Sequence, residues 1–228
     1  MHEILVLCEG HTEREFCRAI IAPAIAHFGI ALAGTIVGKP GRKRGGIRPW
    51  PTYRSELVRL AKERRDRHVA VLVDYYAMPD SWPGRAAPAA PVEQRGPRIE
   101  AALAADLRDD LGDRFHPCVQ VHEFESLLFV SPRVTAAQIS SADDGAAPGL
   151  TAKMEGIRAA CGPTVEHIDD SPDTAPSKRL IGIMPGYDKV AWSIPALAGV
   201  EISLLRRECP WLGRWLLRLE SVGSGPDG

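Results

Sequence analysis

Three short apolar runs divide the first half of the chain, and a segment with helical periodicity follows each. The runs cover residues 3–9 (EILVLCE), 68–76 (HVAVLVDYY) and 115–125 (FHPCVQVHEFE). Continuous apolar runs of this length are typical of strands that are buried on both faces, as in parallel sheets. A weaker run at 34–38 (GTIVG) predicts one more strand.

Segments with helical periodicity lie between these runs. Residues 52–66 and 97–111 predict helices, and Thr12 with Glu15 three residues later predicts a capping box at the start of an earlier helix. Pro23 should kink that helix or begin a second one. The alternation of strand and helix predicts an α/β fold with a mostly parallel sheet flanked by helices.

From about residue 132 the pattern is mainly helical. We therefore expect an α/β core over residues 1–131 and a helical part over 132–220 that completes or covers this core. The polar, glycine-containing end at 221–228 predicts a disordered tail.

Composition changes this picture little. The chain has 228 residues, 45% hydrophobic and 25% charged, with a formal net charge of −1, as in an ordinary globular protein. Binding to nucleic acid would therefore have to come from local charge clusters. No apolar run is long enough to span a membrane, and the first residues do not resemble a signal peptide. Five widely spaced cysteines without a Cys-x-x-Cys motif predict reduced thiols and a cytoplasmic protein.

Carboxylates stand at the ends of the three strong strands. Glu9 ends the first, Asp74 the second, and Glu123 and Glu125 the third. Ligands of parallel α/β sheets bind at this edge, and clustered carboxylates repel one another unless a cation lies among them. Oxygen ligands suit Mg²⁺ or Mn²⁺. We therefore expect these acids to form a metal site, although Asp74 alone could equally cap a loop.

The residues also resemble known families. The stretch CEGHTEREF resembles the first motif of Toprim domains, and its Glu-Gly-x-Thr-Glu form is similar to the OLD-type nuclease branch. Five blocks, from residue 4 to about 190, resemble the DUF4276 family of uncharacterised bacterial proteins: EGHTEREF, VDYYAMPDSWPG, QVHEFESLLF, APSKRL and PGYDKV. The resemblance implies a Toprim-like, Rossmann-like fold.

The resemblance also implies roles for single residues. Glu9 matches the Toprim glutamate that binds metal or transfers a proton, and Glu13 matches the second acid of the OLD-type motif. Asp74 matches the first aspartate of an Asp-x-Asp pair, but Tyr76 stands in the second position, so a carboxylate of the third strand would have to replace that ligand. Lys178 resembles the late lysine that offsets charge on a scissile phosphate.

Candidate phosphate contacts come from glycine-containing and basic stretches. Gly10 would allow a tight turn and a close phosphate, and Ser177 and Arg179 flank Lys178 at a predicted helix start. The loop GRKRGG supplies Arg42, Lys43 and Arg44.

Each candidate has a structural alternative. The basic loop could be a solvated surface, and Glu13 a helix-start acid. Tyr75, Tyr76 and Trp82 could stack on bases or pack in the core, and His122 could be a ligand or a structural group.

These features favour a metal-dependent phosphodiesterase, a nuclease acting on DNA or RNA. The chain has no Gly-x-x-x-x-Gly-Lys-Ser/Thr loop, so the ATPase that accompanies OLD-type proteins would be a separate subunit, in defence against phage or mobile DNA. The alternative is a non-catalytic Toprim-like regulatory or interaction module for that ATPase, which Tyr76 favours. A hydrolase of small phosphorylated molecules is a third hypothesis. The sequence leaves open whether the chain is an enzyme and whether it forms a homo-oligomer.

The basic loop generates one prediction. If Arg42, Lys43 and Arg44 contact phosphates, replacing all three with alanine should weaken binding to every nucleic-acid sequence alike. The log–log salt dependence of binding, measured by fluorescence anisotropy, should flatten by about one unit per lost contact. An unchanged slope would identify the loop as solvated surface.

Overall fold

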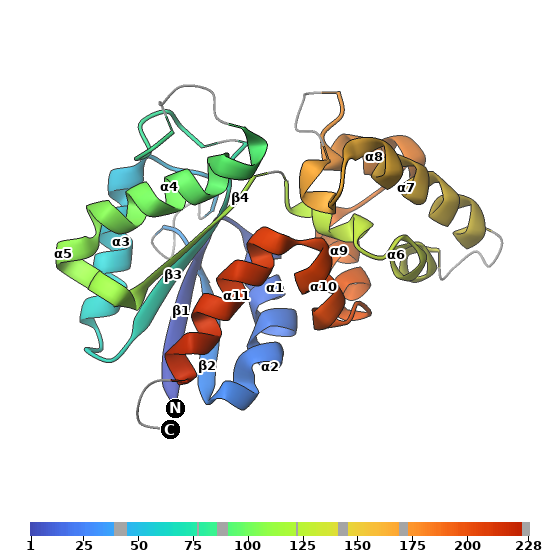
Figure 1. Ribbon diagram of the computed structural model, residues 1–228. Helices are drawn as coiled ribbons and strands as arrows, with labels where there is room; N and C mark the ends of the chain where they lie inside the picture. The colour runs from blue at the N-terminus through green and yellow to red at the C-terminus, as the bar shows by residue number, and fades with distance from the viewer. Residues whose placement is uncertain are drawn as a thin grey trace. The chain divides into compact units, whose positions relative to one another are not determined.

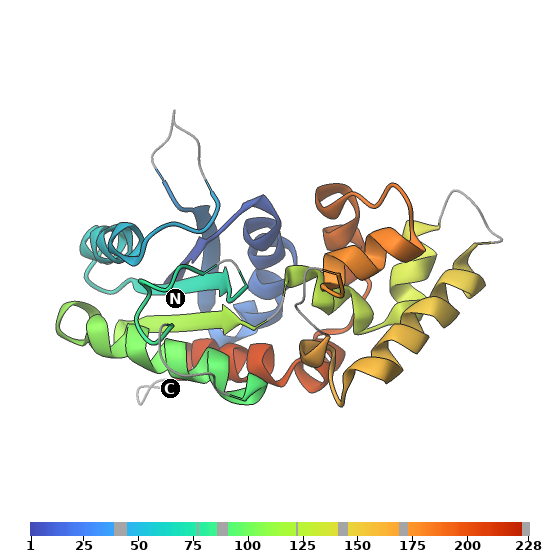
Figure 2. The same cartoon turned by 90° about the horizontal axis from the view of Figure 1, so that it is seen from above.

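A four-stranded sheet forms the centre of the computed structural model, which describes residues 1–38, 45–76, 78–85, 91–121, 123–140, 146–168 and 173–224. The strands are β1 (His2–Cys8), β2 (Ile30–Ile36), β3 (His68–Asp74) and β4 (Phe115–Gln120), in the order β2-β1-β3-β4. All neighbouring strands are parallel, and the arrows of β3 and β4 point the same way in Figure 2. The predicted α/β fold is confirmed.

Two compact units make up the chain. The first comprises Met1–Val121 and Arg214–Gly228, and the second comprises His122–Gly213, so the predicted boundary at residue 131 falls inside the second unit. The helices of the first unit are α1 (His11–Phe16), the π-helix η1 (Cys17–Ile21), α2 (Ala22–Ile25), η2 (Ala26–Phe28), α3 (Trp50–Lys62), α4 (Val92–Asp106), α5 (Arg108–Leu111) and η3 (Gly112–Arg114).

The second unit is helical in its described residues. Its helices are η4 (Phe124–Phe129), α6 (Pro132–Ile139), α7 (Ala147–Cys161), η5 (Val165–His167), α8 (Pro176–Ile183), α9 (Lys189–Ala198) and α10 (Ile202–Glu208). The last helix, α11 (Pro210–Gly223), begins in this unit, and the chain returns to the first unit at Arg214. No helix in the described part of the chain is long and apolar enough to cross a membrane.

Both faces of the sheet are buried, which explains the continuous apolar runs. Figure 1 shows α3, α4 and α5 on one side of the strands and α1, α2 and α11 on the other. Side chains of β1, β3 and β4 form one hydrophobic core with α3 and α4, and this core includes Leu7, Val69, Val71, Val119, Tyr53, Leu57, Ile99 and Leu103. Strand alternation turns the intervening residues of β1 and β3, such as Val6, Ala70 and Leu72, to the opposite face, where they are also buried.

Two side chains cover the exposed backbone of the edge strand β4. Glu100 of α4 accepts a hydrogen bond from the N–H of Val119 (3.0 Å), and Arg218 of α11 donates to the carbonyl of Pro117 (2.7 Å). Arg218 also pairs with Glu100 at 3.0 Å. Pro117 has no N–H to offer another strand, so this edge is protected against pairing with a second sheet.

The helix after β1 begins differently from the prediction. It starts at His11 with Gly10 as its N-cap and no side-chain cap, so the predicted capping box is wrong. Glu15 instead forms ion pairs with Arg14 and Arg18. The expected effect of Pro23 is confirmed, since the helix widens into the π-helix η1 and α2 then begins with Pro23 in its first turn.

The ends of two elements, β2 and α11, also differ from the prediction. The weak strand predicted at 34–38 is β2, which begins at Ile30 because Ile30 and Leu32 enter the core. Residues 221–223 belong to α11, although the prediction placed them in the tail. The helix end is held close to the sheet, since a Cβ on Gly223 would lie 2.0 Å from the carbonyl oxygen of Phe28.

All five cysteines are free thiols, as predicted.

A histidine pair links β3 and β4 at the opposite edge of the sheet from Asp74. Nδ1 of His68 lies 2.8 Å from Nε2 of His116, and the two rings stack. Burial, and then the charge of His68, lower the pKa of His116 to about 4. Burial also lowers the pKa of His68. The folded chain therefore disfavours the charged form of both rings.

This pair predicts a loss of stability in mild acid. The unfolded chain takes up a proton at His116 near pH 6.5, whereas the folded chain resists protonation until about pH 4. The contribution of His116 to the free energy of unfolding is therefore complete above pH 6.5. It declines as the pH drops further, by about 2 kcal/mol between pH 6.5 and pH 5. Urea unfolding across this range should show the decline, and His116→Asn should reduce it. The same decline in both proteins would contradict the assignment.

Candidate functional site

The carboxyl ends of β1 and β3 lie at the same edge of the sheet. Cys8 pairs with Leu72, so Glu9 follows directly after β1, beside the last two residues of β3. The backbone of Glu9 is held by a returning loop, because the N–H of Gly46 donates to its carbonyl at 2.9 Å. Gly45 and Gly46 have φ angles of +83° and +74°, and a Cβ on Gly45 would lie 2.9 Å from the same oxygen. Only glycine fits this approach without strain.

Glu13 folds back over the start of its own helix. Its side chain is buried, and a Cβ on Gly10 would lie 3.0 Å from Oε2 of Glu13. Gly10 itself has φ −147°, an extended conformation that other residues adopt. The backbone bend at this residue therefore does not require glycine, but the absence of a side chain at Gly10 gives room to the carboxylate of Glu13.

A buried tyrosine lies beside both acids. Tyr53 of α3 is fully buried, and the causes that raise its pKa are burial first, and then electrostatic interactions with Glu9, Cys8 and Glu13. The positive charge of Arg48 opposes this shift, because it lowers the pKa of Tyr53. Two carboxylates and a guanidinium therefore act electrostatically on the phenol of Tyr53 near this edge of the sheet. The sequence analysis assigned no role to Tyr53 or Arg48, although both follow closely on the basic loop.

Aromatic packing fixes this tyrosine. The ring of Trp82 meets that of Tyr53 edge to face at 4.9 Å and that of Trp50 at 5.1 Å. Nε1 of Trp82 donates to the carbonyl of Arg48 at 2.8 Å. Trp82 is 1% exposed, so it packs in the core rather than stacking on bases.

The acid at the end of β3 lies on the other face. Strand alternation places Asp74 on the same side as Leu72, away from the face that Tyr53 packs against. The next residue, Tyr75, has the guanidinium of Arg85 4.1 Å from its ring centroid and accepts a hydrogen bond from Arg85 at 2.7 Å. Tyr76 is 44% exposed.

In the second unit, Glu123 caps a helix. Its Oε2 accepts a hydrogen bond from the N–H of Ser177 at 2.9 Å, in the first turn of α8. Arg179 donates to the carbonyl of Thr174 at 2.6 Å, whereas Lys178 is exposed. Ser177 and Arg179, expected to contact phosphate, therefore have partners within the protein.

Glu125 forms a buried ion pair that the sequence analysis missed. The carboxylate is 4% exposed, and its Oε2 lies 3.1 Å from Nζ of Lys189. Burial raises the pKa of Glu125, and Lys189 opposes that shift. Tyr187 lies near the pair and shares a hydrogen bond of 2.9 Å with Ser193. The block PGYDKV, which contains Tyr187 and Lys189, was the available signal.

The predicted acids therefore belong to different units. Glu9, Glu13 and Asp74 lie in the first unit, whereas Glu123 and Glu125 lie in the second together with Lys178. Within the described residues, no group of three or more His, Cys, Asp or Glu side chains is arranged to hold a metal ion. Arg42, Lys43, Arg44 and His122 lie outside the described residues.

A smaller donor set is still suited to magnesium. Mg²⁺ commonly takes one or two carboxylates and completes its shell with water and substrate phosphate. Glu9 and Glu13, with the hydroxyl of Tyr53 close by, fit that type of site. They do not amount to a cage in which protein supplies every ligand.

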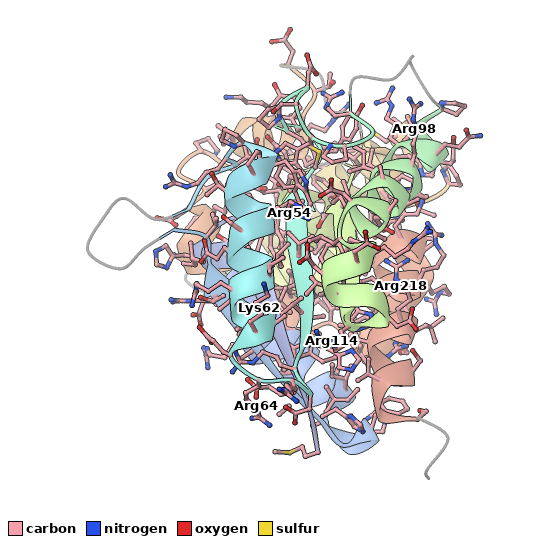
Figure 3. The ribbon with its side chains drawn as sticks, turned by 90° about the vertical axis from the view of Figure 1, so that its left-hand side faces the viewer. Arg54, Lys62, Arg64, Arg98, Arg114 and Arg218 are labelled. Carbon is pink, nitrogen blue, oxygen red and sulfur yellow. The ribbon has the colours of Figure 1, made fainter. Side chains whose placement is uncertain are left out.

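Three arginines on the outer surface of the first unit have acidic partners. Figure 3 labels Arg54, Arg64 and Arg218 among the basic residues of this side. Arg54 pairs with Asp106 and Asp110 at 3.0 and 2.7 Å. Arg64 pairs with Asp66, and Arg218 with Glu100, at 2.9 and 3.0 Å. These ion pairs connect α3 to α4 and α5, and α4 to α11, and reduce the charge available to a phosphate backbone.

Comparisons with known proteins identify one family. The model of the family described as "Domain of unknown function (DUF4276)" matches residues 8–220. No curated protein and no solved structure matches the chain.

The Glu125–Lys189 pair generates a prediction for the second unit. Lys189→Ala should lower the free energy of unfolding by about 1–3 kcal/mol, because it leaves a buried carboxylate without its cation. Glu125→Gln in the same background should restore part of the loss, since a neutral amide costs less to bury. Urea denaturation of the single and double variants measures both changes. Equal stability of Lys189→Ala and the wild type would contradict the structural role of this pair.

Proposed function

The chain belongs to the DUF4276 family, and we propose that it is a metal-dependent phosphodiesterase, a nuclease that acts on DNA or RNA. The observation that carries this proposal is the group of Glu9, Glu13, Tyr53 and Arg48 at the carboxyl edge of a parallel sheet. This edge is where ligands of such sheets bind. Two carboxylates and a guanidinium there suit a cation and a phosphate together.

Glu9 and Glu13 would hold the ion, whereas Asp74 at the end of the neighbouring strand lies on the other face of the sheet and would not be a direct ligand. When bound, Mg²⁺ or Mn²⁺ would orient the phosphate, activate a water molecule and stabilise the leaving oxygen. Arg48 would offset charge on the phosphate, and the basic residues Arg42, Lys43, Arg44 and Lys178 would bind the nucleic-acid backbone.

The resemblance to OLD-type proteins adds a partner to this proposal. A separately encoded ATPase would position the nucleic acid, and the pair would act in the cytoplasm against phage or mobile DNA. The Toprim-like relationship belongs to the same proposal, and it rests on the residues around Glu9 and on the parallel sheet.

A non-catalytic regulatory module for such an ATPase is the second candidate. Two observations favour it: Tyr76 stands where a second aspartate would bind metal, and no group of three metal-binding side chains occurs among the described residues. In this reading the acids at the sheet edge bind an ion or nucleotide without cleavage.

Ion binding is the first test of the proposal. A divalent ion that binds only the folded state stabilises it by mass action, by about 2.7 kcal/mol at a concentration one hundred times the dissociation constant. Millimolar Mn²⁺ should therefore raise the melting temperature of the wild type but not of Glu9→Gln. Glu125→Gln, a buried acid of the second unit, is the matched control and should respond as the wild type does. Equal responses from the wild type and Glu9→Gln would place the ion elsewhere.

Cleavage separates the two candidates. The chain should nick supercoiled plasmid slowly with Mn²⁺, and faster with its partner ATPase. Glu9→Gln should reduce the rate by about 10² or more if this carboxylate acts on the transition state. If Mn²⁺ stabilises the wild type through Glu9 and no metal or partner supports cleavage, the regulatory module is the correct function.

A further inference from the structure

The hydroxyl of Tyr53 is a buried polar group without a hydrogen bond. Its oxygen has no partner in the part of the chain that the structure describes, and the residue is 0% exposed. Such a group costs free energy in the folded state, and most buried hydroxyls are paired for that reason. Tyr187 illustrates the usual arrangement, because its hydroxyl meets Ser193 at 2.9 Å.

Packing leaves this hydroxyl little freedom to find a partner. The ring of Tyr53 is held edge to face by Trp82, which is itself fixed by its hydrogen bond to the backbone of Arg48. The helix that carries Tyr53 packs on β1 and β3 within one hydrophobic core. The oxygen is therefore held at one point. Contacts of Trp82 with Arg48, of Arg48 with Gly45 and of Gly46 with the carbonyl of Glu9 connect it to the end of β1.

We propose that Tyr53 is a ligand-binding residue, and that its hydroxyl donates a hydrogen bond to a phosphoryl oxygen bound at the Glu9–Glu13 edge. This inference rests on the proposed phosphate site and adds a neutral donor to it. A phosphoryl oxygen held by a cation is a strong acceptor, and a donor fixed by packing loses little entropy on binding. The hydroxyl is fully buried in the absence of ligand, so binding would have to open the packing around it while Glu9 and Glu13 keep the cation.

The arrangement has an unusual consequence for stability. Tyr53→Phe keeps the ring and its aromatic contacts but removes the unpaired hydroxyl, so the variant without ligand should melt at the same temperature as the wild type or higher. Tyr187→Phe is the matched control, because it removes a hydroxyl that has a partner. That variant should melt about 2–4 °C lower.

Ligand binding provides the decisive measurement. Calorimetric titration of a nucleoside 5′-monophosphate in the presence of Mn²⁺ should show binding to Tyr53→Phe about tenfold to hundredfold weaker than to the wild type. Mn²⁺ alone should bind both proteins equally, and Tyr187→Phe should bind the monophosphate as the wild type does.

The possible outcomes separate this inference from the proposed function. Equal affinity of Tyr53→Phe and the wild type for the monophosphate would overturn the role of Tyr53 while the phosphate site itself stands. No binding of Mn²⁺ or of the monophosphate to the wild type would overturn both. A variant without ligand that melts as far below the wild type as Tyr187→Phe does would show that Tyr53 has a structural partner, and would also overturn the inference.

Discussion

The requirement that a parallel sheet be covered on both faces governs the first unit of this protein. Four parallel strands place all their carboxyl ends at one edge, and they need helices on each side to remove their apolar side chains from water. Here α3 and α4 cover one face, and α1, α2 and α11 cover the other. This coverage carries Tyr53 on α3 and Glu13 on α1 to the edge where β1 ends in Glu9. The candidate site is therefore a consequence of how the sheet is buried.

Buried polar groups of the first unit are satisfied to different degrees. Along β4, the backbone groups of Val119 and Pro117 are satisfied by Glu100 and Arg218, which also pair with each other. Arg218 has a buried unpaired Nε, but its terminal nitrogen is paired, whereas the hydroxyl of Tyr53 is the single polar group of its side chain and has no partner in the described residues. Folding alone gives no reason to retain an unpaired phenol there, because phenylalanine would fill the same space. The ligand that we propose at the Glu9–Glu13 edge would supply that reason.

Carboxylates in the second unit have a different use. Glu123 accepts from a backbone amide of α8, and Glu166 accepts from the amides of Trp211 and Leu212 at the start of α11. Negative charge at a helix N-terminus is favourable, because it meets both unpaired N–H groups and the positive end of the helix dipole. Glu125 has Lys189 as its counter-ion instead. An acid that resembles a metal ligand in the sequence can therefore serve to hold short helices together.

The sequence by itself determined the strands β1, β3 and β4 and their parallel arrangement, because continuous apolar runs separated by helical segments have few other solutions. It also predicted that Glu9 and Asp74 stand at one edge, since parallel strands share a carboxyl edge, whereas the pairing of β1 with β3 came from the structure. The start of α1 was predicted wrongly, because Thr12 and Glu15 match a capping box only in spacing, while Gly10 is the N-cap and Thr12 lies inside the helix. Only the tertiary structure brought Tyr53 and Arg48 to Glu9, or Lys189 to Glu125. These pairs are separated by tens of residues, and their contacts depend on the packing angle and depth of whole helices, which no local pattern records.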